Sequence, residues 1–82
     1  QQRKFAPVCP DFVLELRSPS DRLKDCKAKM DDWIANGVRL GWLVDYDAQT
    51  AHIYRPGQPA EERSTAEPLS GEDVLPGFLL QL

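Results

Sequence analysis

The sequence predicts an α/β or α+β domain in which a mixed β-sheet packs against one principal helix. Two short apolar segments, residues 12–17 (FVLELR) and 41–45 (GWLVD), have the composition of buried strands. Between them, residues 22–36 repeat apolar side chains at intervals of three and four, as an amphipathic helix does. A strand, a helix and a second strand joined by short connections predict a parallel strand pair linked by a right-handed crossover.

The first elements follow from the order of apolar and turn-forming residues. Residues 1–9 begin with polar side chains and contain Pro7, so we expect an extended lead-in. The strand at 12–17 is close to continuously apolar, which is typical of a central strand covered on both faces.

The helix is predicted to have defined ends and one apolar face. Ser20 or Asp21 is expected to cap its N-terminus, and Gly37 is expected to end it in a left-handed conformation. Its apolar face carries Leu23, Cys26, Met30, Trp33 and Ile34. This face is predicted to pack on the sheet.

The second half of the chain predicts shorter elements. Residues 50–55 alternate in polarity after a turn, so we expect them to pair antiparallel with 41–45 as a hairpin. A short strand is expected near 63–66 and a last one at 78–82. The residues around them are rich in proline and glycine and are predicted to form loops.

Composition limits the class of protein. The 82 residues predict one domain, 1–82, and the net charge of −3 does not indicate a broad basic surface for nucleic acid. No apolar run is long enough to span a membrane and no signal peptide is evident, which favours a cytoplasmic protein with no membrane partner.

Cys9 and Cys26 lack the partners of a zinc site because His52 is the only histidine, and we assign His52 no catalytic role. A disulfide between the two cysteines is disfavoured in that compartment.

Glu15 is the first candidate for chemistry because it interrupts the apolar strand at 12–17. A carboxylate among aliphatic side chains costs several kcal/mol unless it is paired, solvated or bound to a cation. One interpretation is an ion pair with Arg17 or with a lysine of the helix. The other is a metal ligand or general base at the end of a strand, where open α/β sheets place their sites.

The charged residues near Glu15 do not identify which of them pairs with its carboxylate. Asp11 shares its strand face but lies roughly 13 Å away along a straight strand, too far to bind the same ion. Lys27 and Lys29 flank the apolar face of the helix on opposite sides, and either ammonium group can reach toward the sheet, whereas Lys24 points away. Helical geometry does not choose between Lys27 and Lys29.

The blocks "ELRSPSD", "KM", "NGVRLGWLVD" and "YRPG", followed by "VLPGFLLQL", resemble the Uma-two-type restriction endonuclease family, a domain of unknown function. The resemblance runs from about Phe5 to the end of the chain. This family belongs to the PD-(D/E)XK nuclease superfamily. The resemblance therefore implies a restriction-endonuclease-like mixed sheet and a metal-dependent DNA endonuclease that hydrolyses phosphodiester bonds with Mg²⁺ or Mn²⁺.

The resemblance also implies roles for individual residues. The second acid of the superfamily motif falls on Glu15, which would be a metal ligand and catalytic residue. The lysine usually found two residues later is replaced by Arg17, a candidate phosphate contact. The resemblance places the family's lysine on Lys29, which would be the second catalytic residue.

One part of the family pattern has no counterpart in the sequence. The family's first metal-binding aspartate lies on a strand before the segment that contains Phe5, so the chain resembles the C-terminal portion of the family domain, truncated at the N-terminus. Two functions follow: part of a nuclease with DNA as its partner, or a non-catalytic nuclease-fold fragment that acts as an interaction module. An unpaired sheet edge further predicts a homo-oligomer.

Overall fold

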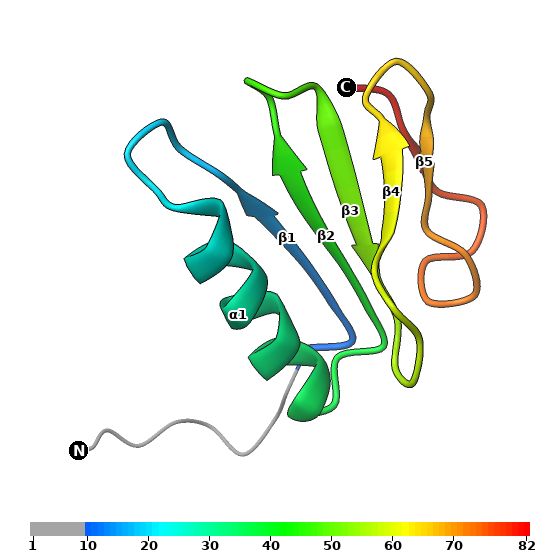
Figure 1. The fold of residues 1–82 in the computed structure, drawn as a ribbon. Helices are drawn as coiled ribbons and strands as arrows, with labels where there is room; N and C mark the ends of the chain where they lie inside the picture. The colour runs from blue at the N-terminus through cyan, green and yellow to red at the C-terminus, as the bar shows by residue number, and fades with distance from the viewer. Residues whose placement is uncertain (1–9) are drawn as a thin grey trace.

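The computed structural model describes residues 10–82, which form one helix and two sheets (Figure 1). The elements in chain order are β1 (Phe12–Leu16), α1 (Leu23–Ala35), β2 (Leu40–Asp45), β3 (Thr50–Tyr54), β4 (Glu61–Ser64), β5 (Leu69–Ser70) and β6 (Leu79–Leu80). The larger sheet has the order β1-β2-β3-β4, and β5 pairs with β6 in a small separate sheet. The predicted lead-in and Cys9 lie outside the described residues.

The strand pairings confirm the predicted mixed sheet. β1 and β2 are parallel neighbours, with Glu15 opposite Leu43, and β2 and β3 form the expected antiparallel hairpin. β4 pairs antiparallel with β3; it begins two residues earlier than the predicted 63–66 segment and overlaps it. β5 falls in a stretch that was predicted to be loop. It pairs antiparallel with β6, which brings the two ends of that stretch together.

The helix lies where it was predicted but does not begin with the predicted cap. Its N-cap residue is Arg22, in an extended conformation and without a side-chain cap hydrogen bond. The carboxylate of Asp21 instead accepts a hydrogen bond from the backbone N–H of Ser18, so it is directed back into the loop. Gly37 follows the helix with φ of 110°, as expected for a residue that ends it.

The sheet has a different apolar core on each face. On the face covered by α1, the fully or nearly buried side chains are Val13, Met30, Val38, Leu43 and Tyr54, with Leu23, Cys26, Trp33 and Ile34 packed against them. The predicted apolar face of the helix is therefore confirmed. On the other face, Leu40, Trp42, Ala51, Ile53 and Leu69 form the second core, and residues of the β5–β6 region pack on it.

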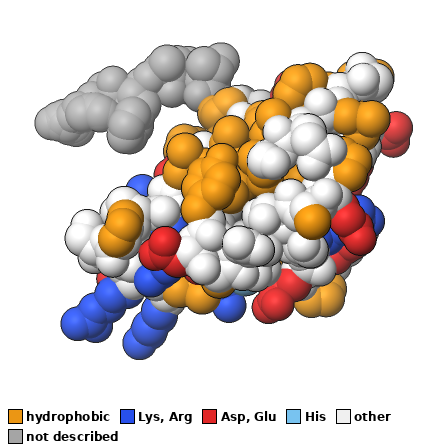
Figure 2. All heavy atoms as spheres, turned by 90° about the horizontal axis from the view of Figure 1, so that it is seen from above, with side chains coloured by type: hydrophobic (Ala, Val, Ile, Leu, Met, Phe, Trp, Pro, Cys, Tyr) orange, Lys and Arg blue, Asp and Glu red, His pale blue; other side chains and the backbone are white. Residues whose placement is uncertain are grey.

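β1 does not have the central position that its apolar sequence predicts. Within residues 10–82 it is an edge strand with β2 as its neighbour. Leu14 and Leu16 point away from α1, and 43% and 56% of their surfaces are exposed. In Figure 2, hydrophobic side chains gather in one broad area of the surface with charged side chains around it. The apolar composition of β1 thus reflects a face that the described residues leave partly uncovered.

The burial of His52 predicts that the stability of the fold depends on pH. It lies on β3 opposite Leu43, and only 4% of its surface is exposed. Burial lowers the pKa of His52, the nearby Lys27 lowers it further, and Glu62 and Asp45 act in the opposite direction. The folded state therefore disfavours the protonated imidazole.

The sign of the resulting effect on stability follows from linkage. As the pH falls below about 6.5, the ordinary pKa of histidine, the unfolded chain binds a proton before the folded chain does. The free energy of unfolding should therefore be fully retained above that pH and should fall as the pH approaches 5. Urea unfolding at a series of pH values checks this, with His52→Gln as the comparison. An equal fall in stability in His52→Gln would contradict the assignment, because no other histidine exists in the chain.

Candidate functional site

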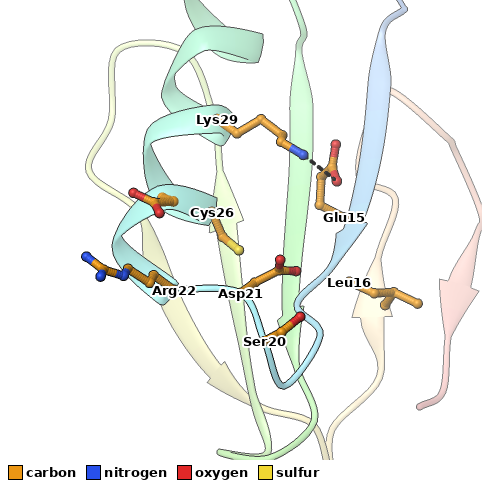
Figure 3. A pocket seen from close by; sticks show the side chains of 8 residues that line it. Glu15, Leu16, Ser20, Asp21, Arg22, Cys26 and Lys29 are labelled. Carbon is orange, nitrogen blue, oxygen red and sulfur yellow. Dashed lines mark ion pairs between the residues drawn. The ribbon is translucent and has the colours of Figure 1, made fainter.

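A pocket of about 350 Å³ lies between the carboxyl end of β1 and the first two turns of α1 (Figure 3). Its lining residues come from β1, from the connecting loop and from the helix: Glu15, Leu16, Ser20, Asp21, Arg22, Asp25, Cys26 and Lys29. The polar members include both acidic and basic groups. In the described part of the chain, no helix is long and apolar enough to cross a membrane.

Glu15 and Lys29 meet across this pocket. The Lys29 Nζ lies 3.7 Å from Glu15 Oε1, and the side chains are 62% and 30% exposed, respectively. Figure 3 shows the two side chains extending toward each other from α1 and β1. An ion pair this exposed contributes about 1 kcal/mol or less to stability. The two side chains therefore meet at one pocket, but the pair is not needed to hold the fold together.

The structure also decides between the two lysines that flank the apolar face of α1. Lys29 is the one that reaches Glu15. Lys27 acts on the opposite side of the helix, where its charge contributes to the lowered pKa of His52 on β3. The helical wheel left these two positions equivalent, whereas the placement of α1 over the β1–β2 pair makes them different.

Glu15 has a second partner that sequence reasoning did not identify. The indole N–H of Trp33 donates a hydrogen bond of 3.2 Å to Glu15 Oε2. The carboxylate is thus satisfied by an ammonium group on one oxygen and by an indole on the other. Both partners come from α1, four residues apart, which places them on the same side of the helix. This four-residue spacing from Lys29 could have pointed to Trp33 in the sequence, but it points equally to Asp25 on the other side of Lys29.

Arg17 is held by neighbouring protein groups. Its Nη1 lies 3.2 Å and 3.3 Å from the two carboxylate oxygens of Asp45, and its Nε donates to the carbonyl oxygen of Asp21 at 3.1 Å. Asp45 also accepts a hydrogen bond from the N–H of Ala48. Arg17 therefore connects the end of β1 to the end of β2 and to the loop before α1. A phosphate contact through Arg17 stays a prediction and would compete with Asp45.

Asp21 is the other acidic group on the loop side of the pocket. It is exposed, and hydrogen bonds from Ser18 lower the pKa of its carboxyl, so it is ionised at neutral pH. Asp11, by contrast, does not line the pocket. It lies at the start of β1, where its carbonyl oxygen accepts from the N–H groups of Arg39 and Leu40.

A divalent metal centre requires more ligands than these residues bring together. Carboxylate oxygens suit Mg²⁺ or Mn²⁺, and Glu15 supplies one such group at the pocket. Within residues 10–82, however, no three His, Cys, Asp or Glu side chains are grouped closely enough to hold a metal ion. The described residues therefore fit one ligand of such a site and do not form the complete centre.

All 82 residues match the Uma2 family, whose description is "Putative restriction endonuclease". The chain belongs to this family. A crystal structure described as a putative nuclease of DUF820 from Anabaena variabilis is 25% identical to the Uma2 chain and superposes with a TM-score of 0.80. The match covers 90% of this chain and 42% of that one, so the Uma2 chain spans less than half of the solved protein. No curated protein matches the sequence.

The comparison confirms the predicted restriction-endonuclease-like fold for this member of the Uma2 family. The individual roles of Glu15 and Lys29 remain predictions, because the match establishes family and fold and does not assign residues.

Proposed function

We propose that this Uma2 chain carries part of the active site of a metal-dependent DNA endonuclease. The observation that supports it most directly is the meeting of Glu15 and Lys29 at a pocket beside the end of β1. A carboxylate that could hold one side of a divalent cation and an ammonium group that could offset charge on the phosphate would each contribute to phosphodiester hydrolysis. The family description and the nuclease fold support the same reaction class.

Each residue has a distinct role in this proposal. Glu15 would hold Mg²⁺ or Mn²⁺ through the carboxylate oxygen that faces Lys29. A bound divalent cation would polarise the scissile phosphate and activate a water molecule. Lys29, which is largely exposed, would turn its ammonium group from the carboxylate toward the negative charge on the phosphate. Its flexible side chain allows that change without movement of α1.

DNA would approach the pocket from the side of α1. Arg22 and Lys29 both line the pocket and place positive charge there, although the chain as a whole is acidic. Local positive charge is sufficient to attract a phosphate when the surrounding carboxylates bind a cation. The expected affinity for DNA in the absence of a divalent cation is therefore low.

Titration with Mn²⁺, followed by calorimetry or by the electron paramagnetic resonance signal of the free ion, tests the proposed cation site. We expect binding at millimolar or lower concentration that is lost in Glu15→Ala. Asp73→Ala is a matched control because Asp73 is an exposed acid that does not line the pocket. Equal binding by the wild-type protein and Glu15→Ala, or no binding by either, would overturn this assignment.

The alternative function, a non-catalytic interaction module, is favoured by a different observation. The described residues lack a group of three side chains able to hold a metal ion. A module of this kind would keep the two cores and the Glu15–Lys29 pair but bind neither Mg²⁺ nor Mn²⁺. The same titration therefore separates the two functions.

We also propose that the chain self-associates through the β1 side of the sheet. Leu14 and Leu16 are exposed there, and the outer edge of β1 has no strand partner within residues 10–82. Exposed apolar side chains on an open edge favour pairing with another strand. Light scattering at high micromolar concentration should report a dimer or larger species, and Leu14→Lys should shift it to a monomer. A monomeric wild-type protein would contradict this proposal.

A further inference from the structure

Trp33 occupies a position that its packing alone does not require. Its ring packs against the core between α1 and the sheet and is half-buried. Its N–H is nevertheless directed at Glu15 Oε2, at 3.2 Å. The other tryptophan, Trp42, is fully buried, and its indole nitrogen has no hydrogen-bond partner among the described residues. Trp42 shows that a tryptophan can pack in this core without its N–H reaching an acceptor, so packing alone does not explain the hydrogen bond of Trp33.

We propose that Trp33 is a positioning residue that fixes the orientation of the Glu15 carboxylate at the pocket. The inference rests on the proposed function, because it concerns how Glu15 is presented to a cation. Trp33 acts through Glu15 and has no assigned contact with substrate.

The two partners of Glu15 differ in how firmly they hold it. The Lys29 side chain is 62% exposed and its Nζ lies 3.7 Å from Oε1, beyond ordinary hydrogen-bond length. A lysine side chain has four rotatable bonds, whereas an indole packed in a core has two torsions that packing restricts. The N–H of Trp33 is thus the more rigid constraint on the carboxylate.

The geometry leaves one oxygen available to the pocket. Because Trp33 binds Oε2, the carboxylate presents Oε1 toward Lys29, which lines the pocket. A cation that binds Glu15 would meet a carboxylate whose rotation about its terminal bond is already restricted. Groups that orient a metal-binding side chain in this way change metal affinity by about 10–100-fold when they are removed.

The indole N–H signals in ¹H–¹⁵N spectra test the contact directly. The chain contains two tryptophans, so two indole cross-peaks are expected, and Trp33→Phe assigns them. We expect Glu15→Ala to displace the Trp33 peak and to leave the Trp42 peak in place. Addition of Mg²⁺ to the wild-type protein should shift the Trp33 peak alone, and this response should be absent in Glu15→Ala.

Mn²⁺ affinity provides the second measurement. Trp33→Phe retains an aromatic ring in the core and removes the N–H, and it should weaken Mn²⁺ binding by about tenfold. Ile34→Val is the matched control, because it trims a neighbouring core contact without removing a hydrogen-bond donor, and it should bind Mn²⁺ as the wild-type protein does. Circular dichroism and the unfolding midpoint establish that each variant is folded.

Two results would overturn the positioning role: an unchanged Trp33 peak in Glu15→Ala, or unweakened Mn²⁺ binding by a folded Trp33→Phe. The failure of the proposed function looks different. If the wild-type protein binds neither Mg²⁺ nor Mn²⁺ while Glu15→Ala still displaces the Trp33 peak, the metal-dependent function is overturned and the Trp33–Glu15 contact is supported.

Discussion

Replacing Asp45 with alanine should lower the free energy of unfolding by about 2–3 kcal/mol, a large share of the stability of a small domain. Asp45 is 3% exposed, and its carboxylate accepts hydrogen bonds from Arg17 and from the N–H of Ala48. The substitution removes those acceptors and leaves the guanidinium group of Arg17 without its anion. Removal of one partner of a buried pair costs more than the pair itself contributes, and the partial exposure of Arg17 places the effect below the full buried value.

Two control variants separate charge from position in this prediction. Asp47→Ala changes an exposed acid two residues further along and should alter stability by less than about 0.5 kcal/mol. Asp45→Asn keeps an acceptor for Ala48 but removes the negative charge, so it should fall between the wild-type protein and Asp45→Ala. Urea unfolding measures all three. An Asp45→Ala variant as stable as Asp47→Ala would show that the Arg17 pair does not support the fold.

The same substitution should also disturb the pocket. Arg17 is joined to the loop before α1 by its hydrogen bond to the carbonyl oxygen of Asp21, which itself lines the pocket. Once Asp45 no longer holds the guanidinium group, that loop loses a connection to the sheet. Arg17, two residues after Glu15, therefore has a structural role in this chain.

The central part of the fold was predictable because its signals are strong and local. Two apolar segments on either side of an amphipathic helix predicted the parallel β1–β2 pair, and a polar turn predicted the β2–β3 hairpin. The edge position of β1 was not predictable in the same way. The apolar composition of a strand reports how hydrophobic its faces are, and it does not report how many strands lie beside it.

The site was predictable in part for a related reason. A carboxylate inside an apolar strand drew attention to Glu15, but residue spacing left Lys27 and Lys29 equivalent, and only the resemblance to the Uma-two-type family favoured Lys29. Trp33 was interpreted as a core residue because its N–H carries no signal in a hydrophobic pattern. Asp21 was predicted to cap the helix, whereas it binds the N–H of Ser18, since short polar side chains compete for several nearby backbone donors.

The 82-residue chain should nick supercoiled plasmid slowly or not at all in the presence of Mn²⁺. The resemblance to the PD-(D/E)XK nucleases implies two acids at the metal, and a second carboxylate would have to lie within about 4–5 Å of Glu15. Asp11 does not line the pocket, and Asp45 is bound to Arg17. The absence of a metal-binding acid should reduce the rate on the order of a thousandfold or more.

Plasmid incubation tests this expectation, and the variants identify the reason for any activity. Robust nicking that disappears in Glu15→Ala would contradict the prediction and would require a second carboxylate. Asp21 is the first residue to examine, because it lines the pocket and is ionised at neutral pH. If nicking is lost in Asp21→Asn, the second acid lies in this chain. If nicking persists in Asp21→Asn and in Asp25→Asn, which changes the other pocket aspartate, and rises with the square of protein concentration, a second copy of the chain supplies the acid. We expect neither, because within residues 10–82 the acids around Glu15 do not gather into a metal-binding group.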